Sequence, residues 1–518
     1  MLLFETFSIN KKTFQKNELI AKKKTMSPLV IASVLIVYFI ALFVVAVMTS
    51  KKADNASFFK ANKSASWILV AFGMIGTSLS GVTFVSVPGT VSVAGMQYFM
   101  MALGFFAGYF VVAYVLLPLY YKLNLTSIYS YLEKRFGSPA YELGALFFIL
   151  SRTVGASLRL FLVVNVIQFL IMDALGIPFA VTAGITLLMI LAYTYNGGVK
   201  TIVWTDTLQT FFMLSALVGC VIYILNQLGG WDASWQAISS TKATSGLDLA
   251  YVFNGDVLHK KYFLKQFLGG AFITIAMTGL DQEMMQKNIS VSNLRDSQRN
   301  MISFSAVMVI VVGMFLFLGA LLFVYMQQFQ LEKAYTGDAI FPTMVMQHMP
   351  PIMGLLFIVG LVSALFPSAD GAITALTSSF CIDLLRFSKM EKSEEEKTKI
   401  RKRVHLAFTV LFFFIVLYFR WLNEKTIVDL LMDLAGYTYG PLLGLFAFGI
   451  LTQRVLIGSK WNVVVICLLS PVLTYLLAIN SKSWFFGYEM GAENLIVNGA
   501  ITFGLLYLRS TFRAADLV

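Results

Sequence analysis

Long apolar blocks are the feature that most constrains how this chain can fold. Thirteen such blocks follow one another, most of them near the length of about 20 residues that crosses a hydrocarbon core about 30 Å thick. Backbone polar groups in lipid must pair within their own segment, so we expect each block to be a membrane-spanning helix. The blocks cover residues 28–49, 66–93, 97–120, 143–172, 177–196, 202–225, 262–280, 300–328, 352–380, 404–422, 427–452, 460–479 and 492–508.

The charged residues support an all-helical membrane protein. Only 13% of the residues are charged, about half the share in soluble domains. The net charge of +12 would suggest nucleic acid in a soluble protein, but here we attribute it to basic cytoplasmic loops. We therefore expect a lipid bilayer around the chain, no nucleic acid and no obligate protein partner.

The uneven distribution of Lys and Arg among the loops predicts how the chain is oriented in the membrane. They are concentrated in one set of loops, above all in 386–403, and we expect that set to face the cytoplasm. The start of the first span then lies outside, the C-terminus lies inside, and the bacterial cytoplasmic membrane is the expected location. Residues 1–25 contradict this orientation because they are rich in Lys and lack a signal-peptide core, so we interpret Met26 as the native start.

The spans predict a single membrane domain over 26–518 with an internal repeat. Residues 66–225 and 262–452 could form two halves of five helices related by inverted topology, as in many secondary transporters. The first helix of each half is interrupted by small and polar residues, which supports this interpretation.

The second span contains a candidate break. Residues 76–83 combine two glycines with four hydroxyl residues, and Pro88 follows. A helix that unwinds here would free carbonyl groups for a cation and direct hydroxyls at a solute. Small residues that allow close helix packing are the alternative explanation.

The ninth span contains a second candidate break. Pro367 has no N–H to donate to the carbonyl of Ser363, so that oxygen needs a hydroxyl, water or cation partner. Asp370 follows in mid-membrane, where a carboxylate is a candidate functional group. It could instead cap or pair with a neighbouring helix.

Other ionisable residues also lie inside apolar blocks. Asp206 suits a monovalent cation or a proton relay, or it pairs with Lys200 or a helix N-terminus. Arg152 and Arg159 share one helix face, and a guanidinium binds a carboxylate through two hydrogen bonds. Arg159 is the deeper one and the better candidate for an anionic solute, although pairing within the bundle is the more common role.

Several motifs together resemble the sodium/solute symporters, the family of sodium-coupled sugar, proline, pantothenate, iodide and sialic acid carriers. The resemblance covers nearly the whole chain from Met26, and the order and spacing of its motifs carry it. The landmarks are 131–137 after the third span, Gly197-Gly198 through Trp204-Thr205-Asp206, Asp281-Gln282 with Gln286, and 436–441.

The resemblance implies a leucine-transporter-type fold of five plus five helices and alternating access. It also implies a main sodium site and a second cation or proton site. Two features depart from the family: Pro367-Ser368 stands where members usually have two hydroxyl residues, and Asp370 stands where members with an additional sodium tend to have Ser or Thr. The main site would comprise Gly76, Leu79, Ala364, Pro367 and Ser368, and the second would comprise Asp206 and Asp370.

The same comparison implies a cavity for a small solute. Ala276, Met277 and Thr278 replace the aromatic residues of the sugar carriers, which argues against an unmodified hexose, and Arg159 favours a sugar acid or a monocarboxylate. The candidate solute-binding residues are Ser78, Ser80, Thr83, Gln97, Arg159, Thr274, Thr278 and Gln282.

The resulting hypothesis is import of a small organic solute by Na⁺ symport. Na⁺ is the expected coupling ion, without an organic cofactor. Proton coupling through the same fold is the main alternative, and a cation channel or a sensor is a weaker one. An enzyme is not expected, because no metal motif, nucleotide loop or Ser/His/Asp set is found.

Overall fold

The computed structural model describes residues 27–50, 55–331, 335–422 and 425–512. The segment 1–25, which we interpreted as a non-native extension, lies outside the described residues. The first half contains α3 (Pro28–Thr49), α4 (Asn55–Lys60), η1 (Ala61–Lys63), α5 (Trp67–Ser78), α6 (Gly81–Ala94), α7 (Tyr98–Val111), η2 (Val112–Leu116), α8 (Leu117–Lys122), α9 (Ser130–Phe136), α10 (Ser138–Ile167), η3 (Gln168–Met172), α11 (Phe179–Gln227) and α12 (Trp231–Ser245).

The second half contains α13 (Phe263–Thr274), η4 (Ile275–Gly279), α14 (Gln282–Ile289), α15 (Leu294–Gln327), η5 (Gly337–Ala339), α16 (Ile340–His348), α17 (Pro351–Leu365), α18 (Pro367–Ser379), η6 (Phe380–Leu384), η7 (Phe387–Lys389), α19 (Glu394–Trp421), α20 (Lys425–Leu451), β1 (Val455–Leu456), α21 (Asn462–Trp484), α22 (Asn494–Leu508) and β2 (Ser510–Thr511). Strands β1 and β2 pair antiparallel.

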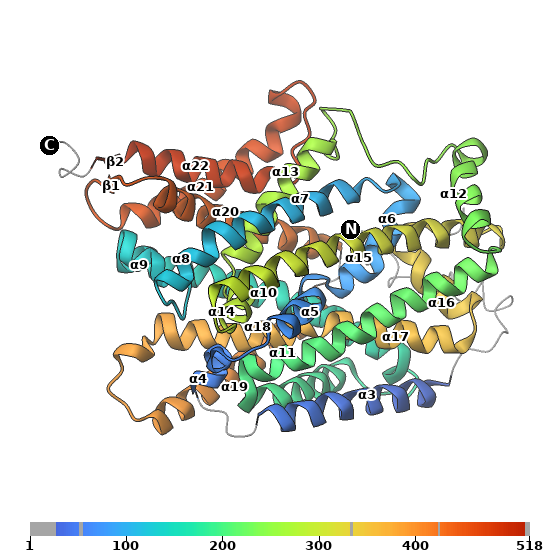
Figure 1. The fold of residues 1–518 in the computed structure, drawn as a ribbon, viewed down its shortest axis with the longest axis horizontal. Coiled ribbons are helices and arrows are strands. Elements are labelled where there is room, and N and C mark those ends of the chain that lie inside the picture. Colours follow the sequence, from blue (N-terminus) through green and yellow to red (C-terminus); the bar gives the residue numbers. More distant parts are fainter. Residues whose placement is uncertain (1–26, 51–54, 332–334, 423–424, 513–518) are drawn as a thin grey trace.

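The helices confirm the membrane-protein fold expected from the apolar blocks. Eight helices in the described part of the chain are long and apolar enough to cross a membrane, two bent helix pairs qualify as further spans, and three shorter apolar helices accompany them. Each predicted span coincides with one of these. The long helices run roughly side by side, with α3 along one edge of the bundle and α21 and α22 along the opposite edge (Figure 1).

Two bent helices occupy equivalent places in the two halves. Helices α5 and α6 meet at 56°, and the segment α13–η4 meets α14 at 68°. These are the first helices of the halves that we expected to be interrupted. The junction of α17 and α18 at Pro367 is milder, because Phe366 between them keeps helical angles and Pro351–Leu384 runs as one span. Breaks like the two bends expose backbone groups inside a membrane protein only where they line a cavity or contact other protein atoms.

The junction between the fifth and sixth spans differs from the loop we expected. Helix α11 continues from Phe179 to Gln227 through a sharp kink at Gly198, where φ is 53° and ψ is −143°. A Cβ at this position would lie 2.6 Å from the Cα of Phe58, so only glycine allows α4 to approach so closely. The kink therefore positions α4 against the beginning of the helix that carries Asp206.

The connecting segments gather at two ends of the bundle. In the view of Figure 1, α9 and the β1–β2 pair lie toward the left, and α12 and α16 lie toward the right. Element η5 packs on α6, where the hydroxyl of Ser86 donates to Asp338 Oδ2 at 2.9 Å and the N–H of Gly337 donates to Ser92 Oγ at 3.0 Å. A short segment thus covers one arm of the broken helix.

Candidate functional site

The break between α5 and α6 lies in the centre of the bundle. Helix α5 packs against α11, α17 and α18. Glycine permits this approach: the backbone N–H of Gly76 donates to Thr210 Oγ1 at 3.1 Å, and a Cβ at Gly76 would lie 2.4 Å from that oxygen. The chain is extended at Ser80, with φ −70° and ψ 165°, before α6 begins. The last carbonyls of α5 therefore lack intrahelical partners, as at any helix C-terminus.

The residues predicted for the main sodium site lie on packed elements. Gly76 and Leu79 end α5, while Ala364, Pro367 and Ser368 lie at the junction of α17 and α18, and all five are buried. Ser368 Oγ has no hydrogen-bond partner among the described residues. A buried hydroxyl without a partner suits a cation ligand, because an unsatisfied polar group is otherwise unfavourable. The assignment itself stays a prediction.

The junction at Pro367 is also connected to α3. Ser363 Oγ donates to the hydroxyl oxygen of Tyr38 on α3 at 3.0 Å. Beyond the proline, the N–H groups of Ala369 and Asp370 both donate to the carbonyl of Phe366. Helical hydrogen bonding thus resumes at the beginning of α18, and Asp370 lies in the first turn of that helix.

Asp206 and Asp370 are both fully buried but have different partners. Asp206 Oδ2 lies 2.6 Å from Nζ of Lys287 and accepts a hydrogen bond from Thr77 at 2.9 Å. Asp370 Oδ2 accepts from the hydroxyl of Tyr193 at 2.6 Å. Lys287, rather than Lys200, is therefore the ion-pair partner of Asp206.

Arg152 closes a second group of charges. Its Nε lies 2.9 Å from Asp281 Oδ2, and its Nη2 lies 3.2 Å from Glu283 Oε2. Tyr439 also donates to Asp281. We expected Arg152 and Arg159 either to neutralise a carboxylate or to bind a solute. Arg152 neutralises carboxylates, because it pairs with Asp281 and Glu283.

Arg159 has a different environment. Together with Arg152 it lines a cavity of about 160 Å³ beside the α5–α6 break. None of the ion pairs found among the described residues includes Arg159. Other residues that line the cavity are Thr77, Ser78, Leu79, Thr83, Tyr98, Phe105, Tyr109, Ile273, Thr274, Met277, Thr278, Met284, Met308 and Val312.

Five of the eight predicted solute-binding residues line this cavity, namely Ser78, Thr83, Arg159, Thr274 and Thr278. The structure does not place the other three in its lining. Gln282 instead holds the segment before α9, since it accepts from the N–H of Ile128 and donates to the carbonyl of Thr126, each at 3.0 Å. Gln97 precedes α7 near Asn254, and Ser80 precedes α6.

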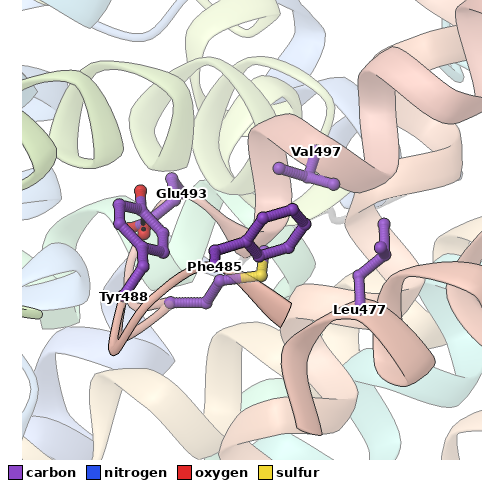
Figure 2. Close-up of a pocket in the computed structure, with 6 residues that line it drawn as sticks. Leu477, Phe485, Tyr488, Glu493 and Val497 are labelled. Carbon is purple, nitrogen blue, oxygen red and sulfur yellow. Dashed lines mark hydrogen bonds between the residues drawn. The ribbon is translucent and has the colours of Figure 1, made fainter. Parts of the chain in front are cut away.

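A larger cavity of about 380 Å³ lies elsewhere, where the loop after α21 meets α22 (Figure 2). Phe485, Leu477 and Val497 make most of its wall apolar, and the hydroxyl of Tyr488 donates to Glu493 at 2.9 Å. The residues that line this cavity include neither Ser78, at the end of α5, nor the buried Asp206 and Asp370. We therefore place the candidate solute site at the smaller cavity.

Sequence reasoning did not identify Lys287, Glu283 or Tyr193 as site residues. Lys287 follows the seventh apolar block, which ends at residue 280, so the apolar pattern did not place it inside the bundle, but all eight residues of α14 are buried. Glu283 and Lys287 are four residues apart on this helix, a spacing that puts opposite charges on one face and could have indicated the pair.

Comparison with known proteins agrees with this geometry. A model of the sodium:solute symporter family matches residues 58–458. The sodium/sialic acid symporter SiaT of Proteus mirabilis (strain HI4320) is 24% identical over 488 residues, covering 91% of this chain and 94% of the relative. The human sodium-coupled monocarboxylate transporter 1 is 24% identical over 394 residues, covering 74% of this chain and 62% of the relative.

Solved structures share the fold. A substrate-bound, outward-open Na⁺-coupled sialic acid symporter matches with a TM-score of 0.78 and 21% identity, covering 93% of this chain and 99% of its own. The nucleobase-cation-symport-1 family transporter Mhp1 matches with a TM-score of 0.54 and 13% identity, covering 88% of this chain and 95% of its own. With the family model matching more than half of the sequence, the chain belongs to the sodium:solute symporter family.

Proposed function

We propose that this protein imports a small carboxylate-bearing solute by Na⁺ symport with alternating access. Membership of the sodium:solute symporter family supports the transport mode. The two bent helices supply the discontinuous backbone at which such transporters bind ions and solutes, and Pro367 removes one further backbone donor between α17 and α18. We further propose that the chain lies in a bacterial cytoplasmic membrane with its C-terminus inside, as the distribution of Lys and Arg predicts.

The solute class is inferred from Arg159, which lines the cavity and forms no ion pair among the described residues. The nearby carboxylates of Asp281 and Glu283 are already paired with Arg152. A cationic group in mid-membrane needs a counter-charge or water. A solute carboxylate supplies both charge and two acceptor oxygens in the geometry that a guanidinium binds best.

The volume of the cavity narrows the class. About 160 Å³ is smaller than the roughly 300–1,000 Å³ of sites for drug-sized ligands. The apolar side chains of Ile273, Met277 and Met308 line the cavity together with the hydroxyl residues. This combination favours a monocarboxylate of a few carbon atoms over a large sugar acid.

The cycle we propose uses the break in the first helix. Na⁺ binds outside between the end of α5 and Ser368 and orders the broken helix. The solute carboxylate then binds Arg159, the cavity closes to the outside, and both are released inside. Binding energy shifts the balance between outward-facing and inward-facing states only as far as each ligand prefers one of them.

The test is uptake into proteoliposomes with Na⁺, K⁺ or choline outside, using monocarboxylates, sugar acids and amino acids. We expect saturable monocarboxylate uptake that requires Na⁺. Arg159→Met should raise the KM by roughly tenfold to a hundredfold, because a hydrogen bond to a charged group is worth about 1.5–3 kcal/mol. Arg299→Met, which removes an arginine outside the cavity, should leave the KM unchanged.

Proton coupling is the second candidate, and one observation favours it. Asp370 is buried, and its hydrogen-bond partners include Tyr193 but no cationic side chain within 4 Å among the described residues. Uptake that depends on a pH gradient and is indifferent to Na⁺ would support this candidate and contradict Na⁺ symport. An unchanged KM in Arg159→Met would contradict the carboxylate assignment under either coupling.

A further inference from the structure

One lysine occupies the centre of the charge cluster described above. Lys287 extends from α14, the second arm of the broken helix in the second half, and its side chain is 4% exposed. Its Nζ contacts Asp206 of α11 at 2.6 Å and Thr77 of α5 at 2.7 Å. The ammonium thus connects α14 and α5, which belong to the two bent helices, with α11.

The oxygen atoms around Nζ have the composition of a site for a small cation. A carboxylate of Asp206 and the hydroxyl of Thr77 lie at contact distance, and Glu283 Oε1 lies 3.8 Å away. Hard monovalent cations and ammonium groups select the same oxygen donors, and a lysine ammonium is a compact point charge with three donors. With Nζ at Oδ2, a second cation at Asp206 would have only Oδ1, which has no hydrogen-bond partner among the described residues, and it would lie beside the charge of the ammonium.

Packing fixes the ammonium in this position. A Cβ at Gly371 on α18 would lie 2.5 Å from Glu283 Oε1 and 3.5 Å from Lys287 Nζ. Glycine at 371 therefore leaves the room that this pair of side chains fills. The hydroxyl of Thr77 accepts from Lys287 and donates to Asp206, so the three groups form a closed ring of contacts.

The count of charges distinguishes the two aspartates. Asp206 has Lys287 as a counter-charge, and Arg152 serves Asp281 and Glu283. Asp370 has Tyr193 and the N–H of Gly371 as partners and forms no ion pair within the described residues. The two aspartates that we expected to flank one cation site are therefore not equivalent, because only Asp206 is already neutralised.

We propose that Lys287 is a tethered substitute for a coupling ion at Asp206, so that Asp206 binds no transported cation. This inference rests on the proposed Na⁺ coupling and concerns how many ions move with each solute. Ions bound at the α5–α18 site drive transport, while the Lys287–Asp206 pair stays in the protein through the cycle.

The experiment compares the Na⁺:solute ratio of wild type and variants, from parallel measurements of radiolabelled Na⁺ and radiolabelled solute uptake into proteoliposomes. Asp206→Asn/Lys287→Met removes both charges and keeps similar side-chain volumes. We expect this double variant to keep the wild-type ratio, because neither residue binds a transported ion. Lys287→Met alone leaves Asp206 without a counter-charge, so Na⁺ should enter there and increase the Na⁺-dependent rise in the temperature of unfolding.

Several outcomes separate this proposal from others. A lower Na⁺:solute ratio in the double variant would mean that Asp206 binds a transported ion and would overturn the proposal. So would a well-folded Lys287→Met whose unfolding temperature responds to Na⁺ as in wild type. If Lys287→Met does not fold, the double variant decides alone, since removing both members of a buried pair is tolerated better than removing one.

A matched control uses a second buried lysine. Lys265 lies near the start of α13, at the end of that arm away from the bend, and its Nζ is 3.9 Å from Glu493 Oε1. Lys265→Met should change neither the ratio nor the response to Na⁺, because Lys265 contacts none of the buried aspartates. Wild-type uptake that is indifferent to Na⁺ would contradict the proposed coupling and would be seen before any variant is tested. Even then, added Na⁺-dependent stabilisation of Lys287→Met would support the assignment of Lys287, and its absence would overturn it.

Discussion

Asp206, Asp281, Glu283 and Asp370 are four carboxylates buried close to the α5–α6 break, and they differ in how they are paired. Asp206 pairs with Lys287, Asp281 with Arg152, Glu283 lies between the two cations, and Asp370 is bound by Tyr193. Charges in mid-membrane are tolerated when they pair or face a cavity. At the residue scale, three of these carboxylates thus have a cationic partner, whereas Asp370 and the guanidinium of Arg159 form no ion pair among the residues that the structure describes.

Ser368 provides a direct test of the main sodium site. Its buried hydroxyl has no hydrogen-bond partner among the residues that the structure describes, so Ser368→Ala should leave the unfolding temperature without Na⁺ nearly unchanged. The Na⁺ concentration for half-maximal uptake should rise by roughly tenfold, equivalent to about 1.4 kcal/mol of lost ion binding. Uptake measured against Na⁺ concentration checks this.

Ser378→Ala is the matched control. Ser378 Oγ accepts from Gln286 at 2.8 Å and donates to the carbonyl of Thr374 at 2.9 Å. Its removal should lower the unfolding temperature with or without Na⁺, because the buried Gln286 amide then keeps only its hydrogen bond to the carbonyl of Phe59 and loses the second one. If both variants behaved alike, Ser368 would have a structural role only.

At the scale of elements, the positions of the spans and of the two bent helices could be predicted from the sequence. What surrounds the short polar segments between them could not. Spans follow from apolar length, and the junction at Pro367 follows from its missing N–H. The burial of α14 could not be predicted, because its residues are polar and the protein that surrounds them comes from distant parts of the chain. For the same reason, neither the Lys287–Asp206 pair nor the hydrogen bond from Tyr193 to Asp370 was evident.

The kink in α11 gives a prediction at this scale. Gly198→Ala should destabilise the protein because an L-residue is strained at φ 53° and its Cβ would collide with α4 at Phe58. The strain alone is about 1–2 kcal/mol, and the collision adds to it. Gly155→Ala, in a helix with no atom within 4 Å of the added Cβ, should instead leave stability unchanged or raise it by about 0.5–1 kcal/mol. Thermal unfolding in detergent checks both variants.

The contact between η5 and α6 predicts a pH effect. Burial raises the pKa of Asp338 above its ordinary value of 3.8, although the hydrogen bond from Ser86 opposes that rise. The stabilisation by the protonated carboxyl is fully present below pH 3.8 and is lost as the pH rises through the higher folded pKa. Asp338→Asn should keep that stabilisation at neutral pH and flatten the dependence of the unfolding temperature on pH over this window. An Asn variant with the wild-type pH dependence would show that other groups cause it.

At the scale of the whole molecule, the free thiols report on unfolding. Cys220, Cys381 and Cys467 are each buried and unbridged. A thiol-reactive dye should therefore label the native protein very slowly and label it rapidly only as the bundle unfolds on heating. Dye fluorescence followed against temperature tests this, with intrinsic tryptophan fluorescence as the independent measure of unfolding. Fast labelling well below the unfolding transition would show that one of these helices opens locally.

The Lys287–Asp206 pair has a consequence for how steeply a cell can concentrate its solute. A charge that crosses a potential of 100 mV gains about 2.3 kcal/mol, which corresponds to a concentration ratio of roughly fiftyfold. A monocarboxylate that enters with a single Na⁺ carries no net charge, so the membrane voltage adds nothing and only the sodium gradient sets the limit. In the role proposed for Lys287, a cation that stays in the protein lowers the maximum accumulation of solute, and it also lowers the number of ions that the cell must expel for each solute molecule imported.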